Sequence, residues 1–141
     1  MNRWLLAILA ASFVTSAQAQ QSPVVTVVTS PEPQTQAMAM VLTLQALQQG
    51  AEAHVLLCGP GGDLALRDAP ASDTAPMKAQ DVGPQALLTR AMAVGATVQV
   101  CALYLPNAGK GPDALMDGVS VATPPAMAER MLDSASRVWS F

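Results

Sequence analysis

Short apolar segments rich in β-branched residues alternate with helix-forming segments along this chain, and this alternation limits the folds available to it. The run of valines and threonines over residues 24–29 is typical of a buried strand. The expected strands cover residues 24–29, 52–57, 97–105, 119–121 and 137–141. The expected helices cover residues 35–49, 84–95, 112–117 and 124–135.

Strands that alternate with helices in this way indicate a parallel sheet covered on both faces. We therefore expect an α/β fold, specifically a flavodoxin-like three-layer sandwich with a mostly parallel five-stranded sheet. Residues 64–83 are rich in proline, alanine and aspartate, and they are expected to form a long surface loop with one short turn of helix. The aspartates of this region, from Asp63 to Asp81, are expected to be solvated.

The first 19 residues have the pattern of a secretory signal peptide. Arg3 supplies the positive charge, an apolar run follows, and Ala17-Gln18-Ala19 has the small-x-small form of a cleavage site. The apolar run covers roughly ten residues, whereas a membrane-spanning helix needs about twenty, which disfavours the alternative of an uncleaved anchor. The sequence therefore predicts a periplasmic protein whose residues 20–141 form a single domain.

The chain carries little charge: 12% of its residues are charged and 51% are hydrophobic. Either the core is unusually rich in alanine, or other subunits cover part of the surface. The first expected helix favours the second explanation, because no charged residue lies between Glu32 and Glu52. Apolar side chains spread around much of this helix, namely Met38, Met40, Val41, Leu44 and Leu47. We expect a homo-oligomer that associates through this helix.

Several other kinds of site are disfavoured. The basic residues are scattered singly, so no stripe suited to nucleic acid or to an anionic membrane surface is present. His54 is the only histidine, and its place in a strand favours a structural role. Met38 and Met40 would lie about 200° apart on a helix and could not share one copper ion. The glycines of residues 59–62 are more typical of a plain turn than of an anion-binding nest. No cofactor or metal is predicted.

The two cysteines, Cys58 and Cys101, follow or end two of the expected strands. In a flavodoxin-like sheet the first strand lies between the second and the third, which would separate these cysteines by roughly 9 to 10 Å. A disulfide needs Cα atoms within about 7 Å, so this strand order disfavours one. The glycines after Cys58, however, could let its loop bend toward Cys101, so a disulfide stays open as an alternative.

Cys101 is the candidate catalytic residue. It lies in the carboxyl half of the third expected strand, and ligands of open parallel sheets bind beyond that end of the strands. The alternative is that Cys101 is a buried and inert core residue, as free cysteines often are.

The segment around Cys101 resembles a known protein family. Residues 95–101 are similar to the Gly-x-x-Val-x-x-Cys strand of the DsrE/DsrF-like sulfur-relay family. The order of the remaining elements, through residues 113–119 to the closing strand at 137–141, is similar as well. The resemblance implies a flavodoxin-like sheet that assembles as a trimer or hexamer, and a persulfide carried at the Cys101 position.

Two functions are consistent with these features. The leading prediction is a periplasmic sulfur carrier, or a binder of small sulfur species, that uses the Cys101 thiolate and exchanges sulfur with a small molecule or a partner protein's thiol. The alternative is a non-catalytic homo-oligomeric binding or assembly module in which Cys101 belongs to the core.

Overall fold

Five short strands form one sheet in the computed structural model, which describes residues 21–78 and 81–141. All neighbouring strands run parallel, and their order across the sheet is β4-β3-β2-β1-β5. The strands are β1 (Val24–Val28), β2 (Ala53–Leu57), β3 (Thr97–Val100), β4 (Ser120–Val121) and β5 (Arg137–Ser140). The predicted signal peptide lies outside the described residues.

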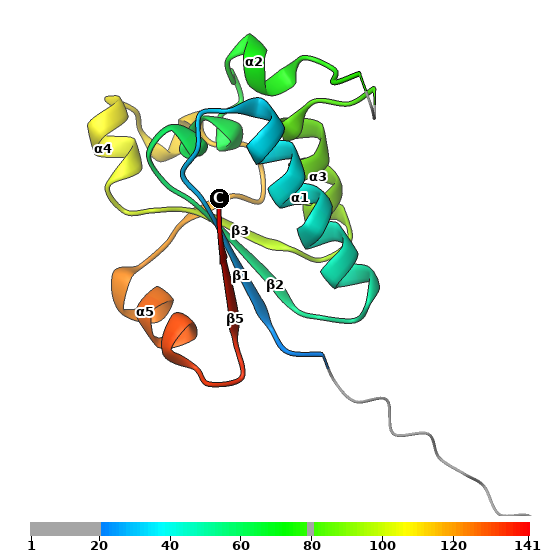
Figure 1. Cartoon of the computed structure of the whole chain (residues 1–141). Helices are drawn as coiled ribbons and strands as arrows, with labels where there is room; N and C mark the ends of the chain where they lie inside the picture. Colours follow the sequence, from blue (N-terminus) through cyan, green and yellow to red (C-terminus); the bar gives the residue numbers. More distant parts are fainter. Residues whose placement is uncertain (1–20, 79–80) are drawn as a thin grey trace, which may run out of the picture.

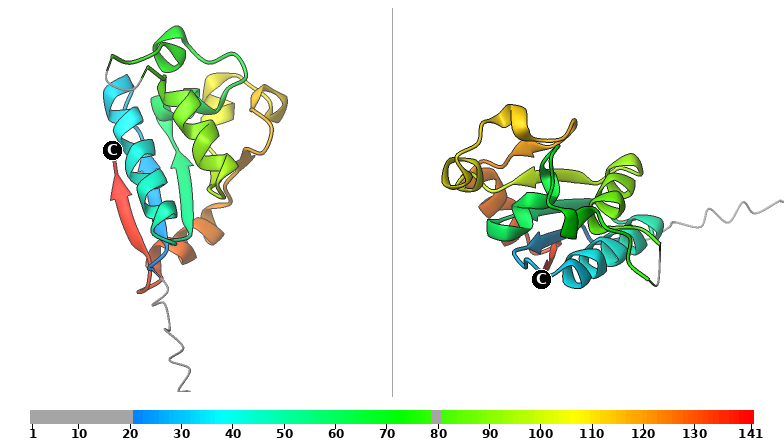
Figure 2. Two further views of the ribbon diagram at one scale, coloured as in Figure 1. Left: turned by 90° about the vertical axis from the view of Figure 1, so that its right-hand side faces the viewer. Right: turned by 90° about the horizontal axis from the view of Figure 1, so that it is seen from above.

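Helices cover both faces of the sheet, so the molecule has three layers (Figure 1). The α-helices are α1 (Pro33–Gln48), α2 (Ala71–Thr74), α3 (Pro84–Ala93), α4 (Tyr104–Ala108) and α5 (Pro124–Leu132). Two 3₁₀ helices, η1 (Gly59–Ala65) and η2 (Pro112–Ala114), lie in the connections. Helices α1 and α3 pack side by side on one face, and α5 covers the other face (Figure 2). The predicted fold class is confirmed.

The core lies on both sides of β2, whose five residues are all buried. Alternate side chains of a strand point to opposite faces, which assigns each residue to one helix layer. Val55 and Leu57 belong to the main core cluster under α1 and α3, whereas Leu56 packs in a smaller cluster with Met127 of α5. Cys58 therefore follows Leu57 onto the α5 face.

The strand order differs from the order expected for this fold. We expected β1 to lie between β2 and β3, but β2 occupies that position and pairs with both of them. Three successive crossovers, from β1 through β4, move across the sheet in one direction. Right-handed connections that move in one direction place their helices on one face, which explains why α1 and α3 are neighbours. The chain then crosses back, with α5 on the opposite face, and β5 pairs with the outer edge of β1.

Two local predictions need correction, and a third, the short helix within the 64–83 loop, is confirmed. The third strand ends at Val100, and the apolar residues after it begin helix α4 instead of extending the strand to residue 105. The expected 64–83 loop contains the end of η1 and the short helix α2. The expected helix at 112–117 is only the 3₁₀ turn η2.

Helix α1 buries Met40 among small and polar residues, and it leaves other large apolar side chains exposed. Thr43 donates a hydrogen bond to the carbonyl oxygen of Ala39, and its hydroxyl also lies 2.8 Å from that of Thr26 in β1. Both threonines are fully buried, so this pair satisfies polar groups inside the core. Met38 and Leu42 remain exposed, as expected for a helix that is apolar on more than one side.

Candidate functional site

The two cysteines lie next to each other at the carboxyl edge of the sheet. Cys58 and Cys101 directly follow Leu57 and Val100, the last paired residues of β2 and β3. The backbone N–H of Cys101 donates to the carbonyl oxygen of Leu57 at 2.9 Å, which continues the ladder between the strands. The separation of two strand spacings that we expected is therefore wrong, because β2 and β3 are direct neighbours.

Both cysteines are free thiols, half-buried, and close enough to interact. Burial, reinforced by hydrogen bonding to Cys101 and by its charge, raises the pKa of the Cys58 thiol to about 12. A thiol with so high a pKa keeps its proton at neutral pH. The Cys58 thiol can consequently act as a hydrogen-bond donor toward the sulfur of Cys101.

Cys101 lines an open cleft beyond the carboxyl ends of the strands. This cleft has a volume of about 490 Å³ and lies between the start of η1 and helix α4. Its lining residues are Gly59, Pro60, Asp63, Cys101, Leu103, Tyr104, Asn107 and Ala108. Cys101 therefore lies against a space that a small molecule can enter, at the edge where open parallel sheets bind their ligands.

A buried tyrosine fixes the inner wall of the cleft. The Tyr104 hydroxyl donates a hydrogen bond to Asp63 Oδ1 at 2.6 Å, and its backbone N–H donates to the carbonyl oxygen of Cys101 at 2.9 Å. Burial, together with the bond to Asp63 and its charge, raises the pKa of the Tyr104 phenol well above its ordinary value. Tyr104 thus stays neutral and links α4 to η1 across the site.

The aspartates near this wall are less solvated than the sequence indicated. Asp63 accepts the Tyr104 bond, and Asp73 of α2 is buried, with Ser72 donating to its Oδ1 at 2.9 Å. Burial raises the pKa of the Asp73 carboxyl, and the charge of Asp63 adds to this effect. Asp63 lines the cleft, whereas Asp73 does not line it and acts on the site only through its charge, which helps to raise the pKa of Tyr104.

The glycines after Cys58 allow η1 to pack closely, so this segment is a structural turn, as predicted. A Cβ atom on Gly61 would lie 2.3 Å from the carbonyl oxygen of Val28, and one on Gly62 would lie 2.4 Å from the Tyr104 ring. Real Cβ atoms do not approach other atoms so closely. Glycine is therefore required at both positions if Cys58 and Tyr104 are to keep their places.

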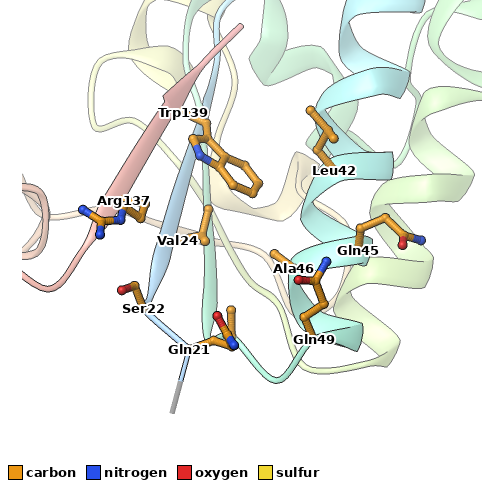
Figure 3. Close-up of a pocket in the computed structure, with 10 residues that line it drawn as sticks. Gln21, Ser22, Val24, Leu42, Gln45, Ala46, Gln49, Arg137 and Trp139 are labelled. Carbon is orange, nitrogen blue, oxygen red and sulfur yellow. The ribbon is translucent and has the colours of Figure 1, made fainter. Parts of the chain in front are cut away.

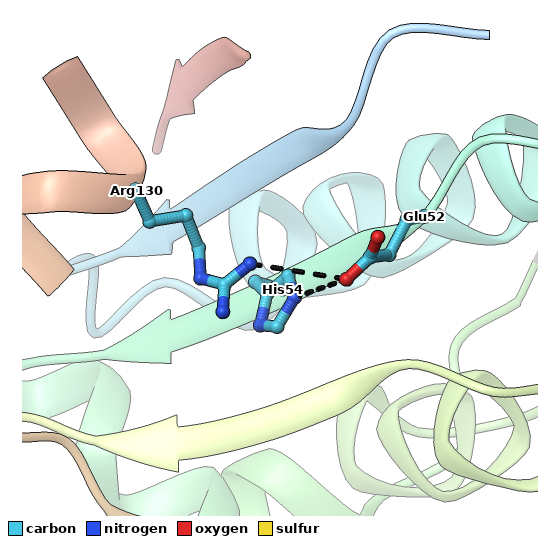
Figure 4. A network of polar contacts seen from close by, with 3 residues as sticks. All are labelled: Glu52, His54 and Arg130. Carbon is cyan, nitrogen blue, oxygen red and sulfur yellow. Dashed lines mark hydrogen bonds and ion pairs between the residues drawn. The ribbon is translucent and has the colours of Figure 1, made fainter. Parts of the chain in front are cut away.

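His54 lies at the opposite end of β2 from Cys58 and takes no part in the cysteine site. Its Nε2 lies 2.9 Å from Glu52 Oε1, and Arg130 of α5 approaches the same carboxylate oxygen at 3.8 Å (Figure 4). The hydrogen bond to His54 is the main cause that lowers the pKa of Glu52. This cluster ties the start of β2 to α5, in agreement with the structural role predicted for His54.

A second hollow lies between α1 and the edge strand β5, away from the cysteines. It has a volume of about 370 Å³, and Trp139, Leu42 and Ala46 contribute apolar surface to it (Figure 3). Its polar groups come from Arg137 and from the uncharged side chains of Gln21, Ser22, Gln45 and Gln49. No paired acid, base or thiol is among its lining residues, so it offers no chemistry comparable to the cysteine cleft.

Two kinds of feature are absent from residues 21–78 and 81–141. Within these residues, no three histidine, cysteine, aspartate or glutamate side chains cluster in a way that could hold a metal ion. In the same part of the chain, none of the helices has the length and hydrophobicity required to span a membrane.

Comparisons with known proteins identify the fold. No family model and no curated protein sequence matches the chain. Two solved structures cover 86% of this chain and 100% of their own, each with a TM-score of 0.63. They are the YchN protein of Escherichia coli, at 20% identity, and MTH1491 of Methanobacterium thermoautotrophicum, a protein of unknown function, at 14% identity. Both are DsrE/F-like by fold, so the chain has the DsrE/F-like fold.

Proposed function

We propose that the protein is an exported sulfur carrier that accepts sulfane sulfur on Cys101. The observation that carries this proposal is the position of the Cys101 thiol on the wall of an open cleft at the carboxyl edge of the sheet. The resemblance of residues 95–101 to the Gly-x-x-Val-x-x-Cys strand of the DsrE/DsrF-like family supports it, because that strand's cysteine carries a persulfide in the family.

The proposed step is a simple transfer between sulfur atoms. The Cys101 thiolate attacks the outer sulfur of a donor persulfide, R–S–SH, and forms a new S–S bond. The bond between the two donor sulfurs breaks, and the donor leaves as the thiolate R–S⁻. Cys101 then carries the persulfide, and no other oxidant or reductant is consumed.

The proposal is tested by the consumption of a small persulfide without oxygen. The reduced protein is mixed with glutathione persulfide, and the glutathione released is measured over the background in buffer. We expect a rapid phase that corresponds to about one equivalent of glutathione per chain. A release of glutathione no faster than in buffer would overturn the proposal.

We also propose that the protein associates with further copies of itself through α1. Met38 and Leu42 are exposed on this helix, with exposed fractions of 50% and 39%, and no charged residue lies on it. Hollows flank the helix on both sides: Leu42 lines the one shared with Trp139, and Met38 lines one shared with Met77. A second copy of the same uncharged helix would bring only apolar and uncharged polar side chains into these hollows, which Arg137 and Lys78 also line.

Leu42→Glu is expected to shift the protein to a smaller assembly without unfolding it. A carboxylate at this position would have to be desolvated in an apolar interface, which opposes association. The matched control is Val94→Glu, a charged replacement of an exposed apolar residue outside α1. Light scattering coupled to size-exclusion chromatography measures the assembly state. A wild-type monomer at micromolar concentration, or equal masses for Leu42→Glu and wild type, would contradict the α1 interface.

A further inference from the structure

We propose that Cys58 is the resolving thiol of this site: it attacks the sulfur-loaded Cys101, closes a Cys58–Cys101 disulfide and releases the carried sulfur as sulfide. This inference rests on the proposed function, because it begins from the persulfide on Cys101. It goes further by assigning a reaction to Cys58 and by naming the product that leaves the site.

The backbone places the two sulfurs in a position to bond. Neighbouring strands lie about 4.8 Å apart, which is inside the range of Cα separations that a disulfide allows. Cys58 and Cys101 occupy neighbouring positions just past the paired residues of β2 and β3. Both side chains pack against the same small cluster, with Leu56 and Met127, on the α5 face of the sheet. The Cα separation expected from the strand spacing therefore lies within the range that a disulfide requires.

The two thiols differ in pKa and in their access to the cleft, and these differences determine which of them accepts sulfur first. The raised pKa of Cys58 keeps it from reacting first, so the donor's sulfur goes to Cys101. Cys101 also lines the cleft directly, whereas Cys58 is not among the residues of its wall. Cys58 is consequently the second member of the pair to react, and it can do so only after Cys101 has been loaded.

The proton held by Cys58 is also the one that the leaving sulfur requires. In the loaded state the outer sulfur on Cys101 carries the negative charge. Cys58 transfers this proton to the outer sulfur and becomes the attacking thiolate. Its sulfur then bonds to the inner sulfur, the bond between inner and outer sulfur breaks, and the outer atom leaves as HS⁻. The sulfane sulfur is reduced to sulfide, and the two cysteines are oxidised to a disulfide. A small dithiol then reduces the disulfide and restores the free pair.

Mass spectrometry of the intact protein distinguishes the loading of Cys101 with sulfur from the later closure of the Cys58–Cys101 disulfide. Wild type, Cys58→Ser and Cys58→Ala are each treated with glutathione persulfide without oxygen, and released sulfide is measured with a bimane reagent. Wild type is expected to lose the mass of two hydrogen atoms and to release sulfide. Both Cys58 variants are expected to gain the mass of one sulfur atom and to release sulfide at least about tenfold more slowly. Addition of dithiothreitol should return wild type to its original mass.

The outcomes separate this inference from the function on which it rests. If wild type keeps the added sulfur and forms no disulfide, Cys58 is not a resolving thiol, although sulfur acceptance by Cys101 stands. If the Cys58 variants gain no sulfur, or gain a glutathionyl group instead, sulfur acceptance itself is wrong. Equal thermal unfolding of the three proteins excludes a loss of fold as the cause, and the alanine variant excludes an effect of the serine hydroxyl.

Discussion

Cys101→Ser is expected to reduce the reaction with glutathione persulfide to the rate measured in buffer, a loss of about a hundredfold or more. Serine preserves the size of the side chain and the shape of the cleft. Its hydroxyl, however, remains protonated at neutral pH and is a poor nucleophile toward sulfur. The measurement is the release of glutathione from the persulfide under the conditions used for wild type.

Cys58→Ser is the matched control for this loss. It removes the neighbouring thiol at the same edge of the sheet but leaves Cys101 on the cleft wall. We expect it to consume the persulfide, whereas Cys101→Ser should not. If Cys101→Ser reacts as fast as wild type, then Cys58 or the solvent is the acceptor, and the role assigned to Cys101 is wrong.

Gly61→Ala is expected to lower the free energy of unfolding by about 3 kcal/mol, at the upper end of the range for overpacking a core. The new Cβ atom would meet the carbonyl oxygen of Val28 at 2.3 Å, and this backbone atom also accepts the N–H of Cys58. Backbone inside a parallel sheet cannot move aside as a flexible side chain can. The clash should displace η1 and, with it, the cleft wall that η1 provides.

Gly59→Ala, in the same loop, is the control for the Gly61 prediction. A Cβ atom there meets nothing within 4 Å, so only its positive φ of 52° opposes alanine. That strain costs about 1 kcal/mol. Denaturant unfolding of both variants measures the difference. Equal losses for the two variants would show that the contact between Gly61 and Val28 does not limit stability.

The sequence predicted most of the helices and strands, but it did not predict which strands lie next to each other in the sheet. The alternation of strands and helices predicted the α/β sandwich, since each valine-rich run needs cover on both faces. It carried no information on whether the third strand would lie beside β1 or beside β2, and the usual flavodoxin order was the wrong choice. The apolar run after Val100 was also ambiguous, because a short buried helix such as α4 has the same hydrophobic composition as a strand.

The candidate site was predictable only in part for the same reason. Cys101 was identified from its place near a strand end. The partnership with Cys58 was missed because it depends on β2 and β3 being neighbours. The hydrogen bond between Tyr104 and Asp63 joins residues 41 positions apart, and a tyrosine assigned to a strand gave no sign of it. Asp63 follows the closely spaced Gly61 and Gly62, and this was the one sequence feature that indicated a tightly packed turn.

Alkylation of the native, reduced protein tests the central claim most directly. The folded protein is treated with iodoacetamide at neutral pH, and each cysteine is then quantified by peptide mass spectrometry. The account predicts that Cys101 is modified in the folded state and that Cys58, with its raised pKa, reacts far more slowly. If Cys101 resists the reagent until the protein is denatured, its thiol is sealed in the core, and the sulfur-carrier function is contradicted.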